Sequence, residues 1–225
     1  MLFQSFKTEE GKYISLDEYI EAMPDGQNDL YYITGENRKE AEQSSHLEIF
    51  KENDQNVLYF LEPVDEIMIQ TAFEYKGKKF KSILKGDIDL GKKDEEEVKK
   101  QKEKFQSLID LMKEALKEDV KDVRFSDRLR ASASCLVADE HDMGVHMEKI
   151  MKAYNQDTPT SKRILEINPK HQVIEKMQSL YEANNSDPVI KDYAGLIYDQ
   201  ALIAEGSKIP DPAKFNQRLY DLMMK

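Results

Sequence analysis

The sequence lacks tryptophan and has one cysteine, Cys135. A single thiol excludes an intramolecular disulfide and is typical of a reducing compartment. Because Cys135 lies in the small-residue run SASCLVA, we expect a buried structural thiol and not a nucleophile. No apolar run approaches the ~18 residues that span a bilayer, and the first residues lack a basic segment followed by an apolar core. These absences predict a soluble, cytoplasmic protein.

The sequence also lacks the motifs that identify many nucleotide-binding, metal-binding and hydrolytic enzymes. It contains no GxGxxG, no GxxxxGKS/T, no HExxH and no paired CxxC. The nearest metal candidate is His141 with His146, but on a helix a spacing of five turns the second imidazole ~140° away from the first. We therefore expect no metal site, no cofactor and no catalytic residue in this chain.

Positive charge is in deficit, because 44 acidic residues against 33 basic ones leave a net charge of −11. Binding to nucleic acid requires clustered lysine and arginine. The one basic segment, KGKKFKSILK at 76–85, interleaves its lysines with Phe80, Ile83 and Leu84, which is typical of an edge strand protected by charge. We expect neither nucleic acid nor a membrane as a partner.

Residues 1–95 have the pattern of a small α/β unit. Two short apolar runs separated by a helical pattern predict a parallel pair of strands joined by a right-handed crossover. The predicted elements are a helix with the capping box SLDE at 15–18, strands at 30–34 and 57–61, an intervening helix broken at Ser44–Ser45, a helix at 64–73 and an extended segment at 73–84.

The charged stretch 91–104 predicts a linker that grades into a long helix, so we place a domain boundary near residue 95. Residues 96–225 then have strand patterns at 120–126, 133–139 and 163–167, with the remaining helices toward the C-terminus. Asp187-Pro188 and Asp211-Pro212 each predict an N-cap followed by proline at the first helical position. The predicted fold is α+β overall, with a small α/β unit followed by an α+β domain that contains a three-stranded sheet.

Methionine is unusually frequent in DEHDMGVHMEKIMKAYN, residues 139–155. A spacing of four drifts by only ~40° around a helix, so the segment predicts an amphipathic helix with Asp139 or Asp142 as its N-cap. Methionine fills irregular gaps in cores and is also frequent on surfaces that bind partners of many shapes. The pattern alone therefore leaves a core face and a binding face both open. The face consists of Met143, Met147, Ile150 and Met151.

The last two predicted helices have apolar faces too broad for one neighbour to cover. A four-helix bundle formed with a second copy of the chain would cover them, and the alternative is packing on their own domain alone. The predicted dimer interface consists of Tyr193, Leu196, Ile197, Gln200, Ala201 and Ala204 on one helix and Phe215, Leu219, Leu222 and Met223 on the next.

Several blocks of the sequence resemble the ninety-kilodalton heat-shock chaperone family (heat shock protein 90) in its bacterial form. SLDEYIEAMPDGQNDLYYITGENRKEAEQSSHLEIFK and VLYFLEPVDEIMI resemble the late middle domain of that family. VKDVRFSDRL, CLVADEHDMGVHMEKIMKA and KRILEINPKHQVI resemble its C-terminal dimerisation domain, in the same order. The resemblance implies that 1–95 is the end of a middle domain and 96–225 a dimerisation domain.

The resemblance implies a homodimer that binds unfolded or partly folded client proteins. Family members begin with an ATP-binding domain, which is absent here, so we expect a fragment that does not hydrolyse ATP, with ATP and Mg²⁺ bound only in the missing part of the parent protein. The client-binding residues that the resemblance implies are Met143, Met147, Ile150 and Met151 with Glu66, Ile67 and Met68.

Two other interpretations stay open at this point. The chain could be a purely structural dimerisation module in which the methionine face is core. It could also be a small α/β enzyme that uses Asp65 and Glu66, although two carboxylates in a first helical turn more often complement the helix dipole. Burial of the methionines separates the first of these from client binding.

Overall fold

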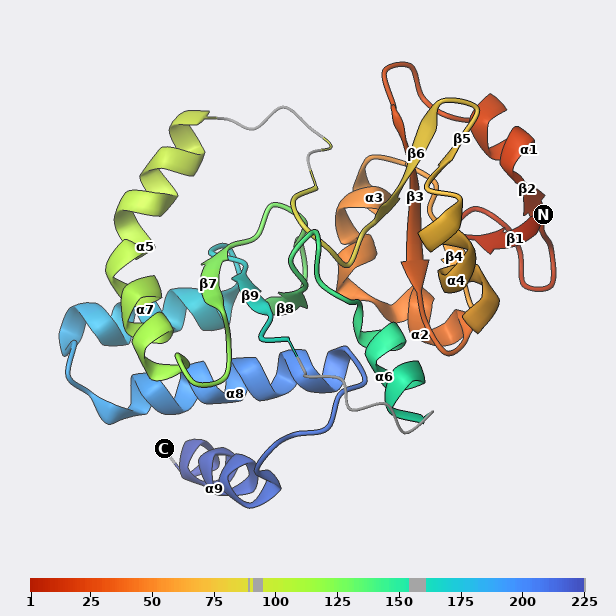
Figure 1. Cartoon of the computed structure of the whole chain (residues 1–225). Helices are drawn as coiled ribbons and strands as arrows, with labels where there is room; N and C mark the ends of the chain where they lie inside the picture. The colour runs from red at the N-terminus through yellow and green to blue at the C-terminus, as the bar shows by residue number, and fades with distance from the viewer. Residues whose placement is uncertain (89, 91–94, 154–160, 225) are drawn as a thin grey trace. The chain divides into compact units, whose positions relative to one another are not determined.

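The computed structural model describes residues 1–88, 90, 95–153 and 161–224 (Figure 1). The chain divides into two compact units, unit 1 (Met1–Leu90 with Ala138–Ser161) and unit 2 (Gly91–Val137 with Lys162–Lys225). The change from one unit to the other after Leu90 is close to the expected boundary. The described residues 138–153, however, belong to unit 1, although the sequence pattern predicted them in the second domain. The division into a middle and a dimerisation domain stays a prediction.

Unit 1 is built on a six-stranded sheet with the order β2-β1-β4-β3-β6-β5. Strand β3 is parallel to both β4 and β6, which confirms the predicted parallel pair. The elements are β1 (Leu2–Ser5), β2 (Ile14–Ser15), α1 (Leu16–Glu21), β3 (Asp29–Thr34), α2 (Arg38–Gln43), the 3-10 helix η1 (Ser45–Leu47), α3 (Glu48–Glu52), β4 (Leu58–Phe60), α4 (Pro63–Thr71), β5 (Glu74–Tyr75), β6 (Lys78–Ser82) and α6 (Val145–Ala153).

Local sequence explains where these elements begin and end. The capping box is present at α1, where Ser15 Oγ accepts a hydrogen bond from the Glu18 amide and Glu18 Oε2 accepts one from the Ser15 amide. Helix α2 ends before Ser44, whose hydroxyl caps η1, so the predicted break is confirmed. The lysine-rich strand β6 is not the sheet edge itself, because the two-residue strand β5 pairs with its first two residues.

Strands β3 and β4 place apolar side chains on both faces of the sheet, so unit 1 has a core on each face. Tyr31 and Tyr59 belong to one core, and Tyr32 and Phe60, which stack, belong to the other. Tyr19 links the first helix to the sheet, because its hydroxyl donates to the Asn56 carbonyl at 2.7 Å.

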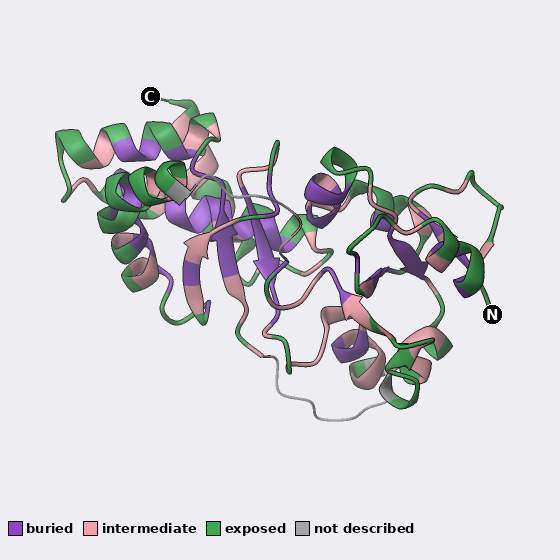
Figure 2. Cartoon of the chain, turned by 90° about the horizontal axis from the view of Figure 1, so that it is seen from above, coloured by how far each residue is buried: buried purple, intermediate pink, exposed green. Residues whose placement is uncertain are grey.

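Unit 2 packs helices on a three-stranded sheet with the order β7-β9-β8, which confirms the predicted α+β class (Figure 2). The central strand β9 is parallel to β7 and antiparallel to β8. The elements are α5 (Glu95–Ala115), β7 (Asp122–Phe125), β8 (Ser134–Val137), β9 (Ile164–Ile167), α7 (Gln172–Ala183), α8 (Pro188–Ala204) and α9 (Pro212–Met223). Asp187 and Asp211 cap α8 and α9, as predicted.

Helix α5 begins at Glu95, so residues 95–104, in the stretch expected to grade from linker into helix, are helical. Residues 91–94 of the predicted linker lie outside the described part of the chain. The later turns of α5 bury Phe105, Leu108 and Met112 in the core of unit 2. Once those turns are fixed, extending the helix adds one backbone hydrogen bond for each residue, and this favours helix through the charged stretch.

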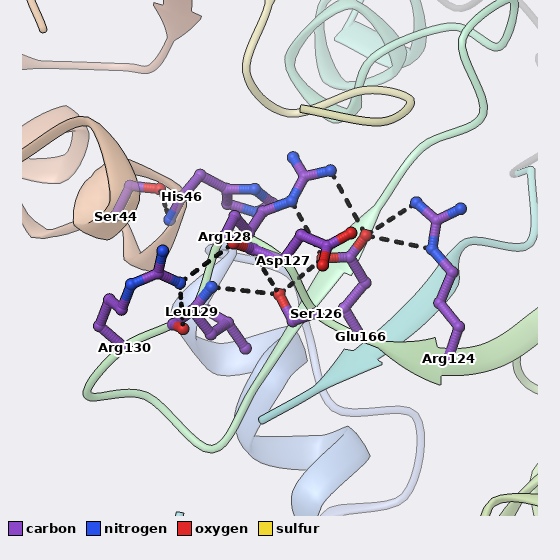
Figure 3. Close-up of polar contacts among 9 residues, drawn as sticks. All are labelled: Ser44, His46, Arg124, Ser126, Asp127, Arg128, Leu129, Arg130 and Glu166. Carbon is purple, nitrogen blue, oxygen red and sulfur yellow. Dashed lines mark hydrogen bonds and ion pairs between the residues drawn. The ribbon is translucent and has the colours of Figure 1, made fainter. Parts of the chain in front are cut away.

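A buried carboxylate joins strands β7 and β9 (Figure 3). Glu166, which is 3% exposed, accepts hydrogen bonds from Arg124 Nη2 at 2.7 Å and from Arg128 Nε at 3.0 Å. The Ser126 hydroxyl donates to the same carboxylate at 2.8 Å and accepts from the amides of Arg128 and Leu129. The cluster therefore fixes the chain that leaves β7 to the middle strand of the sheet.

Candidate functional site

Helix α4 presents an apolar surface to solvent. Pro63 occupies its first turn, and Asp65 Oδ2 accepts a hydrogen bond from the Glu62 amide at 3.2 Å, so this carboxylate caps the helix. Val64, Ile67 and Phe73 are exposed, with 58% of Ile67 accessible to solvent. Ile67 was predicted to bind clients, but Val64 and Phe73 were not, because a sequence pattern does not tell which apolar residues a fold leaves uncovered.

Helix α6 lies beside α4 in unit 1. The imidazole Nδ1 of His146 contacts Glu66 Oε1, and these side chains are 14% and 10% exposed. Lys149 Nζ pairs with Glu36 at 2.9 Å, and Lys85 Nζ donates to the Asp142 carbonyl at 2.6 Å. Polar contacts thus hold α6 and its preceding loop on unit 1. Glu66 of α4 and the methionine helix α6, which were both predicted to bind clients, are therefore in contact through His146.

The methionine face is only partly accessible in the single chain. Met147 is 8% exposed, and Met143, Ile150 and Met151 are half-buried, as is Met68 on α4. Helix α6 begins at Val145, so Met143 precedes the helix and neither Asp139 nor Asp142 caps it. The core interpretation therefore fits Met147, while the client-binding role of the whole set stays a prediction.

We expect the contact between α6 and α4 to weaken as the pH rises above neutrality. The hydrogen bond to Glu66 raises the pKa of His146 above its usual value; Glu40 also raises this pKa, while burial and Lys149 lower it. A histidine pKa raised in the folded state gives stability that is complete below the unfolded pKa and lost as the pH passes the folded pKa. Hydrogen exchange in α6 should therefore increase, after correction for intrinsic rates, as the pH rises from below the unfolded pKa of ~6.5 through the raised pKa of His146.

The matched control for this pH dependence is His146→Gln, which keeps a hydrogen-bonding side chain and removes the titration. The variant should show faster exchange at pH 6 than the wild-type chain and little further change at higher pH. Equal pH dependence in both proteins would assign the effect to another group.

The predicted dimer residues divide into two sets according to burial. Four of these residues are buried within their own chain: Tyr193, Leu196, Ile197 and Ala201. Tyr193, Ile197 and Ala201 belong to the hydrophobic core of unit 2. Gln200 and Ala204 are exposed, Phe215, Leu219 and Leu222 are half-buried, and Met223 is 81% exposed. The first set is covered without a second copy, so an interface would have to be formed mainly by the second set.

Exposed apolar residues that the sequence analysis missed extend this second set. Ile203, at the end of α8, and Tyr220 and Met224, in and after α9, are large hydrophobic residues that face solvent. Within the described residues of α9, 212–223, none is buried. The helical spacing of apolar residues in α9 indicated an amphipathic helix. Only the packed structure distinguishes the side that faces α8 from the side that faces solvent.

The described residues contain no group of three or more His, Cys, Asp or Glu side chains that could hold a metal ion. His141 is exposed, and His146 is engaged with Glu66. Asp65 and Glu66, the candidate acid–base residues, serve as a helix cap and as the partner of His146. In the same part of the chain, no helix has the length and apolar character needed to cross a membrane.

Both units mix helices with a sheet, and large apolar side chains on α4 and α9 are exposed to solvent. The family model "Hsp90 protein" matches residues 1–225, and the chain belongs to the Hsp90 family of chaperones.

Similar proteins are bacterial. The chain is 46% identical to "Chaperone protein HtpG" of Geobacter metallireducens over 229 aligned residues and 45% identical to that of Geobacter sulfurreducens, covering 100% of this chain and 35% of each relative. It is 43% identical to the HtpG chaperone of Nitrosomonas europaea, over 96% of this chain and 33% of the relative. The chain thus spans about a third of the length of the relatives it matches.

Proposed function

We propose that this chain provides homodimerisation and part of the client-binding surface of an ATP-dependent chaperone of the HtpG type, in the cytoplasm. The observation that carries the proposal is α9, a 12-residue helix with no buried residue and with Tyr220 and Met223 exposed. Isolated helices of this length are marginal in water, so α9 needs cover from another surface. A second copy supplies an identical helix and can form the predicted four-helix bundle.

Client binding is supported by a different observation. Val64, Ile67 and Phe73 are exposed apolar side chains on and just after α4, and exposed apolar surface on a folded protein favours protein binding. The half-buried methionines of α6 lie on the neighbouring helix, and their flexible side chains suit partners of many shapes. We propose unfolded or partly folded proteins as the ligands, and we expect no binding of ATP, Mg²⁺ or nucleic acid by this chain.

We expect the wild-type chain to have the mass of a dimer and the double variant Tyr220→Asp, Met223→Asp to be a monomer. Both side chains are exposed in the single chain, so aspartate is tolerated by the fold but introduces four charges into a symmetric interface. Light scattering over a dilution series should give a dissociation constant at least about 100-fold higher for the variant. Circular dichroism should show unchanged helix content.

The control is Tyr13→Asp, a substitution of another exposed aromatic residue, in unit 1. It should leave the dimer intact. A wild-type chain that stays monomeric at high micromolar concentration would contradict homodimerisation, and a double variant that stays dimeric would place the interface elsewhere.

A further inference from the structure

Gly195 lies in the middle of α8, where glycine is costly. Glycine in a helix interior destabilises the helix relative to alanine, so a packing reason is expected. A Cβ atom built on Gly195 would overlap the guanidinium carbon and both terminal nitrogens of Arg218 on α9. The absence of a side chain at Gly195 therefore makes a slot in α8 that holds the guanidinium of Arg218.

Two aspartates flank this slot on the same face of α8, three residues before and four residues after the glycine. Arg218 Nη1 donates to Asp199 Oδ2 at 3.1 Å, and Arg218 Nε lies 3.8 Å from Asp192 Oδ1. The Arg218 side chain is only 16% exposed. Asp199, at 8%, is better shielded from solvent than Asp192, at 42%, so the Asp199 pair is the stronger of the two.

The slot fixes the rotation of α9 about its own axis. At ~100° per residue, Tyr220 and Met223 lie ~160° and ~140° around the helix from Arg218, whereas Leu222 lies within ~40° of it. Leu222 accordingly packs against the core of unit 2, while Tyr220 and Met223 face solvent.

We propose that Arg218, held in the Gly195 slot between Asp192 and Asp199, is the positioning residue that determines which face of α9 meets the second copy. This inference rests on the proposed homodimer. Arg218 acts within one chain: it orients the interface and does not itself contact the partner. Lysine cannot replace it, because a single ammonium lacks the planar fork that fills the slot and reaches both carboxylates.

The first test is Gly195→Ala. The methyl group has to displace the flexible end of Arg218 from the slot, while alanine itself stabilises α8. We expect helix content and thermal stability to be kept or raised, and the dimer dissociation constant to increase about tenfold or more. A general loss of folding cannot produce this combination. The control is Lys191→Ala, an exposed substitution on α8 that should change neither quantity.

The second test reverses the charges. Asp199→Arg and Arg218→Asp should each weaken the dimer about tenfold or more, and both changes in one chain should recover part of this loss, because the charges are again complementary although the slot stays unfilled. Mixing the two single variants distinguishes a pair within one chain from a pair between copies. If the pair were between copies, the mixed dimer would contain two complementary pairs and recover, so recovery on mixing would overturn the inference.

Hydrogen exchange of the α9 amides separates failure of this inference from failure of the proposed homodimer. If the wild-type chain is monomeric, homodimerisation is wrong, yet faster α9 exchange in Gly195→Ala would still support the positioning role of Arg218 within the chain. If the wild-type chain is dimeric and Gly195→Ala changes neither its affinity nor its α9 exchange, the inference is wrong and the homodimer stands.

Discussion

Replacing Glu166 with alanine is expected to destabilise unit 2 by about 3–5 kcal/mol, because removal of one partner leaves buried charge uncompensated. Glu166 is shielded from solvent and neutralises Arg124 and Arg128, and it also accepts the hydrogen bond of the Ser126 hydroxyl. Its loss leaves two guanidinium groups without this carboxylate. It also removes the hydrogen bonds from Ser126 and Arg128, after β7, to the central strand β9. The substitution therefore weakens the attachment of the β7 end of the sheet as well as the ion pairs.

Urea unfolding followed by circular dichroism measures this change, since the chain has no tryptophan for fluorescence. Glu166→Gln keeps the shape and one acceptor oxygen, so the difference between this variant and the wild-type chain isolates the charge. Glu114→Ala is the control for an exposed ion pair, because Glu114 pairs with Lys117 at the surface and should cause no measurable loss. An unfolding midpoint for Glu166→Ala equal to that of the wild-type chain would show that the cluster contributes nothing net.

We expect the double variant Ile67→Asp, Phe73→Asp to lose most of the binding of an unfolded protein while keeping the fold and the mass of the wild-type chain. Both side chains are exposed, so aspartate costs little within the chain, but it places charge where an apolar client segment would dock. Loss of two large apolar contacts at a binding surface should weaken affinity by about 100-fold or more. Binding of reduced, alkylated lactalbumin, followed by fluorescence anisotropy, measures the effect.

Tyr13→Asp is a matched control for this variant, because Tyr13 is 57% exposed, Ile67 is 58% exposed, and both lie in unit 1. Equal loss of binding in both variants would indicate a response to net charge and not to the α4 surface. A further variant, Met151→Asp, tests whether the half-buried face of α6 takes part in the same surface. Retained binding in all three variants would move the client surface away from α4 and α6.

The pattern of apolar residues determined much of the local structure. The capping box at Ser15, the break at Ser44–Ser45 and the Asp-Pro starts of the last two helices depend on neighbouring residues, and they were predicted correctly. The missed pieces were β1 and β2, which are short; β1 pairs with β2 and joins the sheet through β4, a strand distant in sequence. The start of α5 was placed only within the charged stretch 91–104, because the core residues that stabilise this helix begin ten residues after Glu95.

The candidate sites were less predictable, since helical periodicity identifies an apolar face but not what covers it. Leu196 and Met223 were assigned to one interface by the same argument, yet Leu196 is buried in its own chain and Met223 is open to solvent. Met147 and Ile67 were likewise grouped as client contacts, and they too differ in exposure. The apolar pattern predicted that α4, α6 and α9 are helices, but it did not give the start of α6 or the elements that pack against these helices.

The sequence by itself determined the family, the α+β class, the capped helices and the residue types available for binding, because each depends on local pattern or on similarity along the chain. Tertiary structure alone decided that residues 138–153 belong to unit 1, that Glu66 meets His146, and that Gly195 holds Arg218. These contacts join residues that are 23 to 80 positions apart. They depend on how whole elements pack, and no short stretch of sequence contains that information.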